Sequence, residues 1–206
     1  MAISSLTKFT VPLASDQSAA NQGTLMPKLQ YRFRISFENF GVSTPTTELT
    51  KQVASAGRPK MEADNQEIWV YNSKINYMGR PKWGEISVKI RDDVTGSVAK
   101  LVGEQMQKQF DFFEQSSAAS GGDYKFSLLL EITDGGNGAF QPTVLETWEL
   151  DGCYVTKYEY GEMDYTKNDP VLITLTIQPD NCIQTTGAET PPSGRTTGTI
   201  ATASGV

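Results

Sequence analysis

The carboxylates of this sequence are its strongest candidates for catalytic chemistry. Asp92 and Asp93 are adjacent, and Glu159, Glu162 and Asp164 lie close together further along the chain. Two carboxylates at a set separation in a cleft can hydrolyse glycosidic bonds. Nothing in the pattern around either group points to a cleft. We therefore assign no catalytic residue to this chain.

A glycine-rich run at 134–138, Asp-Gly-Gly-Asn-Gly, is the next candidate for a site. A phosphate-binding loop would need a Lys followed by Ser or Thr at its end, and none follows. A calcium loop would need acidic ligands at regular positions, and these are missing too. We interpret the run as a connection between two strands.

The lack of histidine restricts the possible chemistry further. The chain has 206 residues and no His, which removes Ser-His-Asp and Cys-His catalysis and most zinc sites. The first residues have no basic segment followed by an apolar one, so we expect no signal peptide. Cys153 and Cys182 are then expected to be reduced thiols. The sequence predicts no metal site, no cofactor and no enzymatic activity.

Composition and charge narrow the class of protein. The residues are 38% hydrophobic and 20% charged, which is typical of a folded domain with a real core. No apolar run approaches the roughly 18 residues of a membrane span. Residues 28–91 carry eleven Lys or Arg against six Asp or Glu, whereas 92–206 carry six against seventeen. The two blocks either average out over one surface or favour head-to-tail contact between copies. The net charge of −6 argues against tight nucleic-acid binding.

Alternating hydrophobicity predicts a body made mainly of strands. From 29 to 37 apolar and polar residues alternate strictly, as in a strand with one buried face. We read Asp151-Gly152 as a tight hairpin turn between two of the strands. The other predicted strands are 83–91, 124–133, 143–150, 153–160 and 171–178, with a strand or hairpin at 67–78.

One segment, 93–115, has helical periodicity instead. Its apolar residues recur at spacings of three and four, which predicts an amphipathic helix capped by Asp92 or Asp93. The fold class is therefore mainly β and α+β by elements: an antiparallel β-sandwich or barrel with one long amphipathic helix. The apolar positions of the predicted helix are Val94, Val98, Leu101, Val102, Met106, Phe110 and Phe113.

Composition divides the chain into three parts. Residues 1–25 are a polar N-terminal arm, 26–183 form the β domain, and 184–206 are a polar tail with almost no large apolar side chain. Each tryptophan falls in or beside an alternating strand. We expect packing in the core or at a subunit interface for Trp69, Trp83 and Trp148.

The order of these segments resembles a known family. A Pro-x-Leu start leads into an amphipathic strand, a segment of small residues follows, a strand runs directly into the helix, and an apolar-x-Gly-x-apolar hairpin precedes the closing strand. The segments are 26–35, 51–59, 80–93, 148–155 and 171–178. In this order they resemble the tail tube proteins of contractile-tailed bacteriophages, which are related in fold to type VI secretion tube proteins. The resemblance covers residues 26–183.

The resemblance implies a structural role. It implies a domain whose sheets join those of neighbours into a ring-shaped barrel, with hexameric rings stacked head to tail as the DNA-conducting inner tail tube. The implied partners are further copies of the chain, the tail sheath, and the baseplate and tail terminator proteins. Genomic DNA would pass without specific binding, and no membrane is involved. The implied location is the phage tail of the virion, after assembly in the host cytoplasm.

Two sets of surface residues follow from this resemblance. DNA passes a neutral or acidic lining without sticking, and the carboxylates that we expect to face the lumen are Glu149, Asp151 and Glu159. The helix would lie away from the lumen, and the positions that we expect to face the sheath are Lys100, Glu104 and Lys108.

Three alternatives remain open at the level of sequence. A baseplate tube initiator or the ring of a type VI secretion tube would keep the fold and change the partners and the copy number. A monomeric β-barrel that binds a small ligand would instead have an apolar pocket and no self-assembly.

Overall fold

A large antiparallel sheet forms the body of the protein, as the sequence predicts. The computed structural model describes residues 5–10, 23–25, 27–43, 46–134 and 142–186. The strands follow the order β3-β10-β11-β12-β7-β4, and β13 pairs with β11. Their bounds are β3 Phe33–Glu38, β4 Val53–Ala56, β7 Ile86–Arg91, β10 Phe126–Thr133, β11 Val144–Tyr160, β12 Leu172–Gln178 and β13 Asn181–Thr186.

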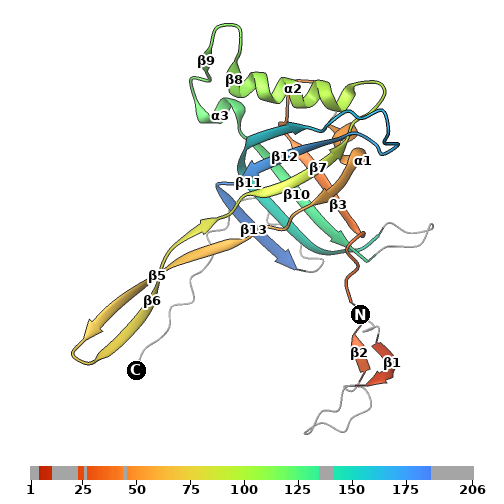
Figure 1. Cartoon of the computed structure of the whole chain (residues 1–206). Coiled ribbons are helices and arrows are strands. Elements are labelled where there is room, and N and C mark those ends of the chain that lie inside the picture. The colour runs from red at the N-terminus through yellow and green to blue at the C-terminus, as the bar shows by residue number, and fades with distance from the viewer. Residues whose placement is uncertain (1–4, 11–22, 26, 44–45, 135–141, 187–206) are drawn as a thin grey trace.

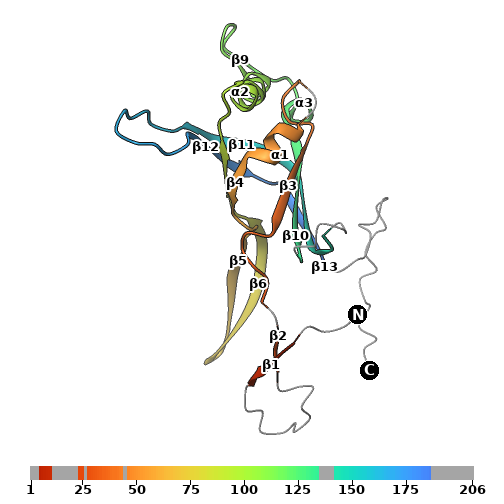
Figure 2. The ribbon, with the colours of Figure 1, turned by 90° about the vertical axis from the view of Figure 1, so that its right-hand side faces the viewer.

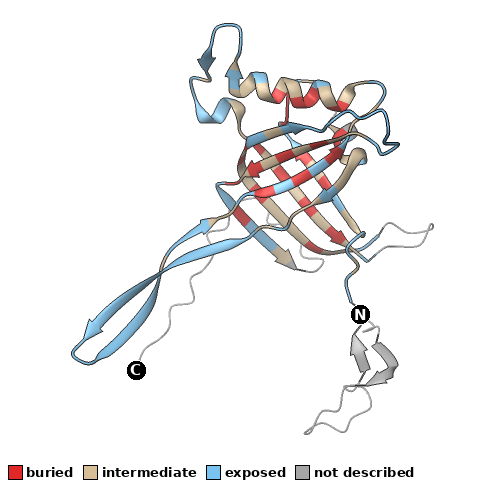
Figure 3. Cartoon of the chain, viewed as in Figure 1, coloured by how far each residue is buried: buried red, intermediate tan, exposed pale blue. Residues whose placement is uncertain are grey.

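The sheet curls into an open barrel around one core. β11 pairs with β10 and β13 along its first half and with β12 along its second half, so the two layers share this strand. β3 and β4 are the ends of the strand order and face each other across the opening (Figure 2). Buried side chains lie on the inner faces of both layers (Figure 3). They include Ile35, Phe37, Val88, Ile90, Leu128, Leu150, Ile173 and Leu175.

The predicted hairpin turn at Asp151-Gly152 is wrong, because β11 runs through it as one strand. Phe126 lies opposite Cys153 but Leu128 lies opposite Leu150, so β11 carries one extra residue there. This is a β-bulge, and it bends the strand. Gly152 has φ of +65°. A glycine at positive φ suits a tight turn and a bulge equally, so the sequence signal was ambiguous.

A helix crosses one end of the barrel (Figure 1). This helix, α2, spans Ser97–Gln109 and buries Val98, Leu101 and Val102. It is shorter than the predicted 93–115. It begins after Gly96, which has φ of +71°, and it ends where Phe110 turns to extended backbone. The carboxylate of Asp93 accepts the backbone N–H of Val98 at 3.1 Å, so the residue expected to cap the helix does serve its first turn.

Several short elements accompany α2. α1 spans Thr47–Gln52 and α3 spans Gly121–Tyr124. Beyond the end of α2, β8 (Phe110–Asp111) and β9 (Ser116–Ser117) form a short two-stranded ribbon. No helix in the described part of the chain is long and apolar enough to cross a membrane.

A long hairpin projects from the barrel, where the sequence predicts a strand or hairpin at 67–78. β5 (Met61–Val70) and β6 (Ser73–Trp83) pair along their whole length, away from the core (Figure 1). Within the predicted arm, β1 (Ser5–Thr10) pairs with β2 (Gly23–Leu25). β13 ends at Thr186, three residues past the predicted domain boundary of 183. Residues 135–138 of the glycine-rich run and 187–206 of the tail lie outside the described residues.

The bulge at Gly152 gives a first testable prediction. A Cβ at this position would lie 2.3 Å from Oδ2 of Asp180, in addition to the cost of positive φ. We expect Gly152→Ala to lower the free energy of unfolding by about 1–3 kcal/mol or more, measured by urea denaturation. The matched control is Gly103→Ala in α2, where a Cβ would meet nothing within 4 Å. That change should raise stability by roughly 0.5–1 kcal/mol. Wild-type stability in Gly152→Ala would contradict the bulge geometry.

Candidate assembly surfaces

The β5–β6 hairpin exposes apolar side chains along one of its faces. Ile68 lies opposite Ile75 in the register, and Tyr77 follows on the same face. Their exposed fractions are 49% for Ile68, 57% for Ile75 and 50% for Tyr77. No other described element covers this face (Figure 3). Contiguous apolar surface of this kind marks sites of interaction between proteins.

The opposite face of the hairpin mixes charge and aromatic surface. Trp69 lies opposite Lys74, whose Nζ is 5.7 Å from the indole ring and 2.8 Å from Oε1 of Glu67. Trp69 is 68% exposed, whereas Trp83 and Trp148 pack against the core. Two of the three tryptophans thus serve the core, and the third lies on a projecting surface.

A buried carboxylate fastens the base of the hairpin. Glu146, on β11, is only 4% exposed. It accepts hydrogen bonds from Nζ of Lys28 at 2.5 Å, from the Arg58 guanidinium at 2.9 Å, and from the side chains of Trp148 and Gln184. Burial raises its pKa, but the bonds from Lys28 and Trp148 and the charge of Arg58 outweigh this, so the pKa lies below its ordinary value.

Arg58 lies between β4 and β5, so this carboxylate joins the entry of the hairpin to β11 and, through Gln184, to β13. We did not identify Glu146 from sequence. The signal was present, because Glu146 shares the inward-facing alternation of Trp148 and Leu150, where an acidic residue needs partners.

The three carboxylates expected in a lumen lie on the outward side of β11, and none is part of the core. The structure divides them, however. Glu149 and Asp151 belong to the half of β11 that pairs with β10 and β13. Glu159 belongs to the half that pairs with β12, and its Oε1 lies 2.5 Å from Nζ of Lys157.

The outward faces of the two sheet layers differ in charge. The layer of β3, β10 and the first half of β11, with the residue just before β3, carries four carboxylates against two arginines. The layer of the second half of β11, β12 and β7, with the residue just before β7, carries three cations against two carboxylates. The first set is Glu38, Glu131, Glu149 and Asp151 with Arg32 and Arg34; the second is Lys89, Arg91 and Lys157 with Glu85 and Glu159. The acidic surface is therefore the β3-β10-β11 layer, and Glu159 does not belong to it.

Two of the three helix residues expected to face a sheath are used within the domain. Glu104 accepts hydrogen bonds from the hydroxyl of Ser43 at 2.6 Å and from the backbone N–H groups of Ser43 and Val42 at 2.7 and 3.1 Å. These bonds lower the pKa of Glu104 to about 2. Lys108 donates to the carbonyl of Asn39 at 3.2 Å. Lys100 has its Nζ 3.8 Å from Oε1 of Glu104, but 68% of its side chain is exposed, so it can still contact a partner.

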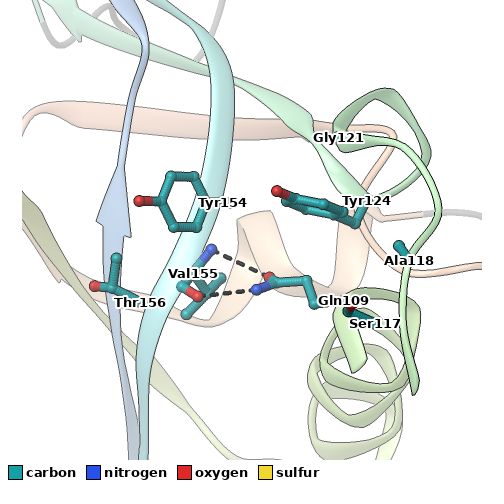
Figure 4. Close-up of a pocket in the computed structure, with 8 residues that line it drawn as sticks. All are labelled: Gln109, Ser117, Ala118, Gly121, Tyr124, Tyr154, Val155 and Thr156. Atoms are coloured by element: carbon teal, nitrogen blue, oxygen red, sulfur yellow. Dashed lines mark hydrogen bonds between the residues drawn. The ribbon is translucent and has the colours of Figure 1, made fainter. Parts of the chain in front are cut away.

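Two glutamines attach α2 to the rest of the domain. Gln105 is fully buried; it accepts the N–H of Gly41 at 2.9 Å and donates to the carbonyl of Tyr124 at 2.7 Å. Gln109 brackets the backbone of Val155 with bonds of 3.2 and 3.0 Å (Figure 4). Sequence reasoning missed both residues, although they continue the helix's buried face at a spacing of four.

The hollow beside Gln109 offers no set of free polar groups. Its volume is about 530 Å³, and Tyr124 and Tyr154 lie at its wall (Figure 4). Every buried side-chain nitrogen and oxygen in the described residues has a hydrogen-bond partner. The same residues contain no group of three potential metal ligands.

Both cysteines are free and buried, in agreement with the prediction of reduced thiols. Burial raises the pKa of Cys153 to about 12 and that of Cys182 to about 11. Thiols of this kind react slowly at neutral pH, because the thiolate is the reactive form.

Comparison with solved structures assigns the fold. The tube-terminating cap of the anti-feeding prophage is 14% identical with a TM-score of 0.58, over 86% of this chain and 100% of that chain. A chain of the sheath–tube complex of an extracellular contractile injection system is 16% identical with a TM-score of 0.55, over 78% and 92%. A chain of the anti-feeding prophage baseplate is 12% identical with a TM-score of 0.53, over 80% and 99%.

At these identities the likeness concerns the fold. The chain thus has the fold found in the tube, cap and baseplate assemblies of contractile injection systems, as the resemblance implies. No protein-family model matches the sequence, and no curated protein sequence matches it.

Glu104 gives a second prediction, on pH dependence. Its folded pKa is about 2, below the ordinary value of 4.5, so it stabilises the fold above pH 4.5 and loses this contribution as the pH falls toward 2. We expect Glu104→Gln to lower the free energy of unfolding by roughly 1–3 kcal/mol at pH 7. The difference from wild type should shrink between pH 4.5 and pH 2. Glu162→Gln, at an exposed position, is the control and should have little effect at either pH. A pH-independent difference for Glu104→Gln would contradict this account.

Proposed function

We propose that this chain is a non-enzymatic structural subunit of the inner tail tube of a contractile phage, stacking as hexameric rings that enclose a DNA-conducting channel. The observation that carries the proposal is the β5–β6 hairpin, which presents an apolar face that its own domain leaves uncovered. A fold shared with chains of contractile injection systems supports the same function. The partners are further copies, the sheath, and the baseplate and terminator proteins.

The sheet edges support lateral association between copies. β13 pairs with β11 alone, so its other side has no strand partner in the described chain. Pairing such edges with a neighbour removes open edges from the sheet. Contacts between two different surfaces, repeated from copy to copy, close a ring or extend a filament.

The distribution of charge supports a particular orientation in the ring. The acidic layer of β3, β10 and the first half of β11 faces the channel, with Glu149 and Asp151 in its lining. Carboxylates there repel DNA phosphates and keep the passing DNA from binding. Glu159, beside Lys157, contributes less to this repulsion. The α2 side, with Lys100, faces the sheath.

A single ring at one end of the tube is the second candidate. The likeness to the tube-terminating cap covers all of that chain, which favours a ring that ends or starts a tube as well as a ring that repeats. A baseplate initiator or a type VI ring belongs to the same class of assembly. Electron microscopy distinguishes them, because a repeating subunit forms long tubes and an end subunit forms closed rings.

The hairpin provides the test of self-assembly. We expect Ile68→Ser with Ile75→Ser to weaken association by at least tenfold, because two apolar side chains lose their burial between copies. The stability of the monomer should change by less than about 0.5 kcal/mol per site, since both positions are exposed. Sedimentation velocity and negative-stain electron microscopy measure the assembled fraction.

A matched control changes the opposite face of the same hairpin. Asn65→Ser with Asn76→Ser alters two polar residues that lie across from Met78 and Glu67. This variant should assemble like wild type. If the isoleucine variant assembled equally well, the hairpin would not be the contact that carries the proposal.

The channel lining has its own test. In long tubes, Glu149→Cys should react with a small maleimide but not with a large polymer-linked maleimide, which cannot enter the channel. Lys100→Cys, on the outer surface, should react with both reagents. The native thiols are buried and give little background. Equal reaction of Glu149→Cys with the large reagent in tubes and in dissociated protein would place Glu149 outside the channel.

A further inference from the structure

The β8–β9 ribbon, beyond the end of α2, carries exposed aromatic side chains that have no role in the function proposed above. We call Phe110, Phe112 and Phe113 the aromatic knob. Phe112 is 53% exposed and Phe113 is 96% exposed, and the ring of Phe110 contacts that of Phe112 with centroids 5.2 Å apart. The sequence placed Phe110 and Phe113 on the buried face of a helix, but the helix ends before them.

The knob is held in shape and carries negative charge. Oδ1 of Asp111 accepts the N–H groups of Phe113 at 2.9 Å and Glu114 at 3.3 Å, and the side chain of Gln107 at 2.8 Å. These bonds keep the pKa of Asp111 below its ordinary value, so the carboxylate is charged at neutral pH. A preorganised loop loses less conformational entropy when it docks.

A groove of complementary chemistry lies between the two edge strands β3 and β4. Its volume is about 920 Å³. Apolar side chains that are not fully buried form part of its wall, and we call it the edge groove; these side chains are Leu29, Tyr31, Phe33, Val53 and Ala56. Its cations are Lys28, Arg32, Arg34, Arg58 and Lys60.

The edge groove keeps an excess of positive charge. Glu146 pairs with Lys28 and Arg58, and Glu131 pairs with Arg34, so two carboxylates stand against five cations. An apolar partner with its own carboxylates would therefore fit this groove. The aromatic knob, with Asp111 and Glu114 beside its rings, has this chemistry.

The two features lie at opposite ends of the domain. Figures 1 and 2 both place β8 and β9 beyond α2, whereas the start of β3 and the passage from β4 to β5 lie at the far end. A copy cannot fill its own groove with its own knob. Contact between them joins different surfaces of successive copies, which is the head-to-tail geometry of a filament.

We propose that the aromatic knob of one copy docks in the edge groove of the next copy along the tube axis. The inference rests on the proposed function, and it assigns the two surfaces that stack one ring on another. The hairpin fits the groove less well, because its three acidic and three basic residues balance each other. A phenylalanine buries about 150–250 Å² when it is fully covered, and Phe112 is already half covered within its own chain. The knob therefore supplies only part of the roughly 1,200 Å² of a stable interface.

Cross-linking in the full chain tests this contact. Ser116→Cys lies in β9 beside the knob, and Ser55→Cys lines the edge groove; both replace exposed serines and leave the phenylalanines intact. We expect a short bis-maleimide to convert assembled double-variant protein into a covalent ladder on a denaturing gel. Each single variant should give no ladder. The unmodified chain, with its two buried cysteines, is the background control.

A second pair of positions tests the competing occupant of the groove. Asn72→Cys, at the turn of the β5–β6 hairpin, is combined with Ser55→Cys. A ladder from this pair and none from the Ser116 pair would overturn the knob contact and put the hairpin in the groove. Tubes that form normally but give no ladder with the Ser116 pair would also overturn it, while leaving the proposed function intact. Failure of the unmodified chain to assemble at all would overturn both.

Discussion

The bend in β11 is the constraint on which the rest of the structure depends. This strand belongs to both sheet layers, and its extra residue at Gly152 lets the chain turn from one layer into the other without breaking its pairing. The bend works because a residue without a Cβ takes a positive φ beside Asp180. The two layers then enclose one core.

Polar side chains attach the outer elements to this core. Gln109 holds α2 on β11, and Gln105 joins α2 to Gly41 and to α3. Glu104 ties the chain after β3 to the helix, and Glu146 fixes the entry to the long hairpin. Gln105 and Glu146 are themselves buried, where a polar group without a partner is costly. The hairpin and the β8–β9 ribbon can therefore project as defined shapes, and defined shapes are what repeated assembly requires.

The strands and the helix could be predicted from the sequence, because periods of two and of three to four residues report directly on burial of one face. The Asp151-Gly152 bulge could not, since the same two residues also make hairpin turns. Phe110 and Phe113 have helical spacing, yet they belong to the aromatic knob at the β8–β9 ribbon. Spacing alone does not show whether an apolar side chain is covered by its own chain or by another. The polar positions of a helix can face solvent or polar groups of the same domain, and the sequence pattern is the same in both cases. Glu104 and Lys108 bond to polar groups of their own domain.

The domain has one hydrophobic core and several surfaces that no described element covers: the edges of β3, β4 and β13, an apolar hairpin face, an aromatic knob and a cationic groove. The central claim is that further copies of the chain complete these surfaces. Cryo-electron microscopy of the unmodified protein over a range of concentrations tests it most directly. We expect stacked rings with a continuous channel, with the hairpin buried between copies. A monomer that persists at every concentration, with the hairpin in solvent, would contradict it.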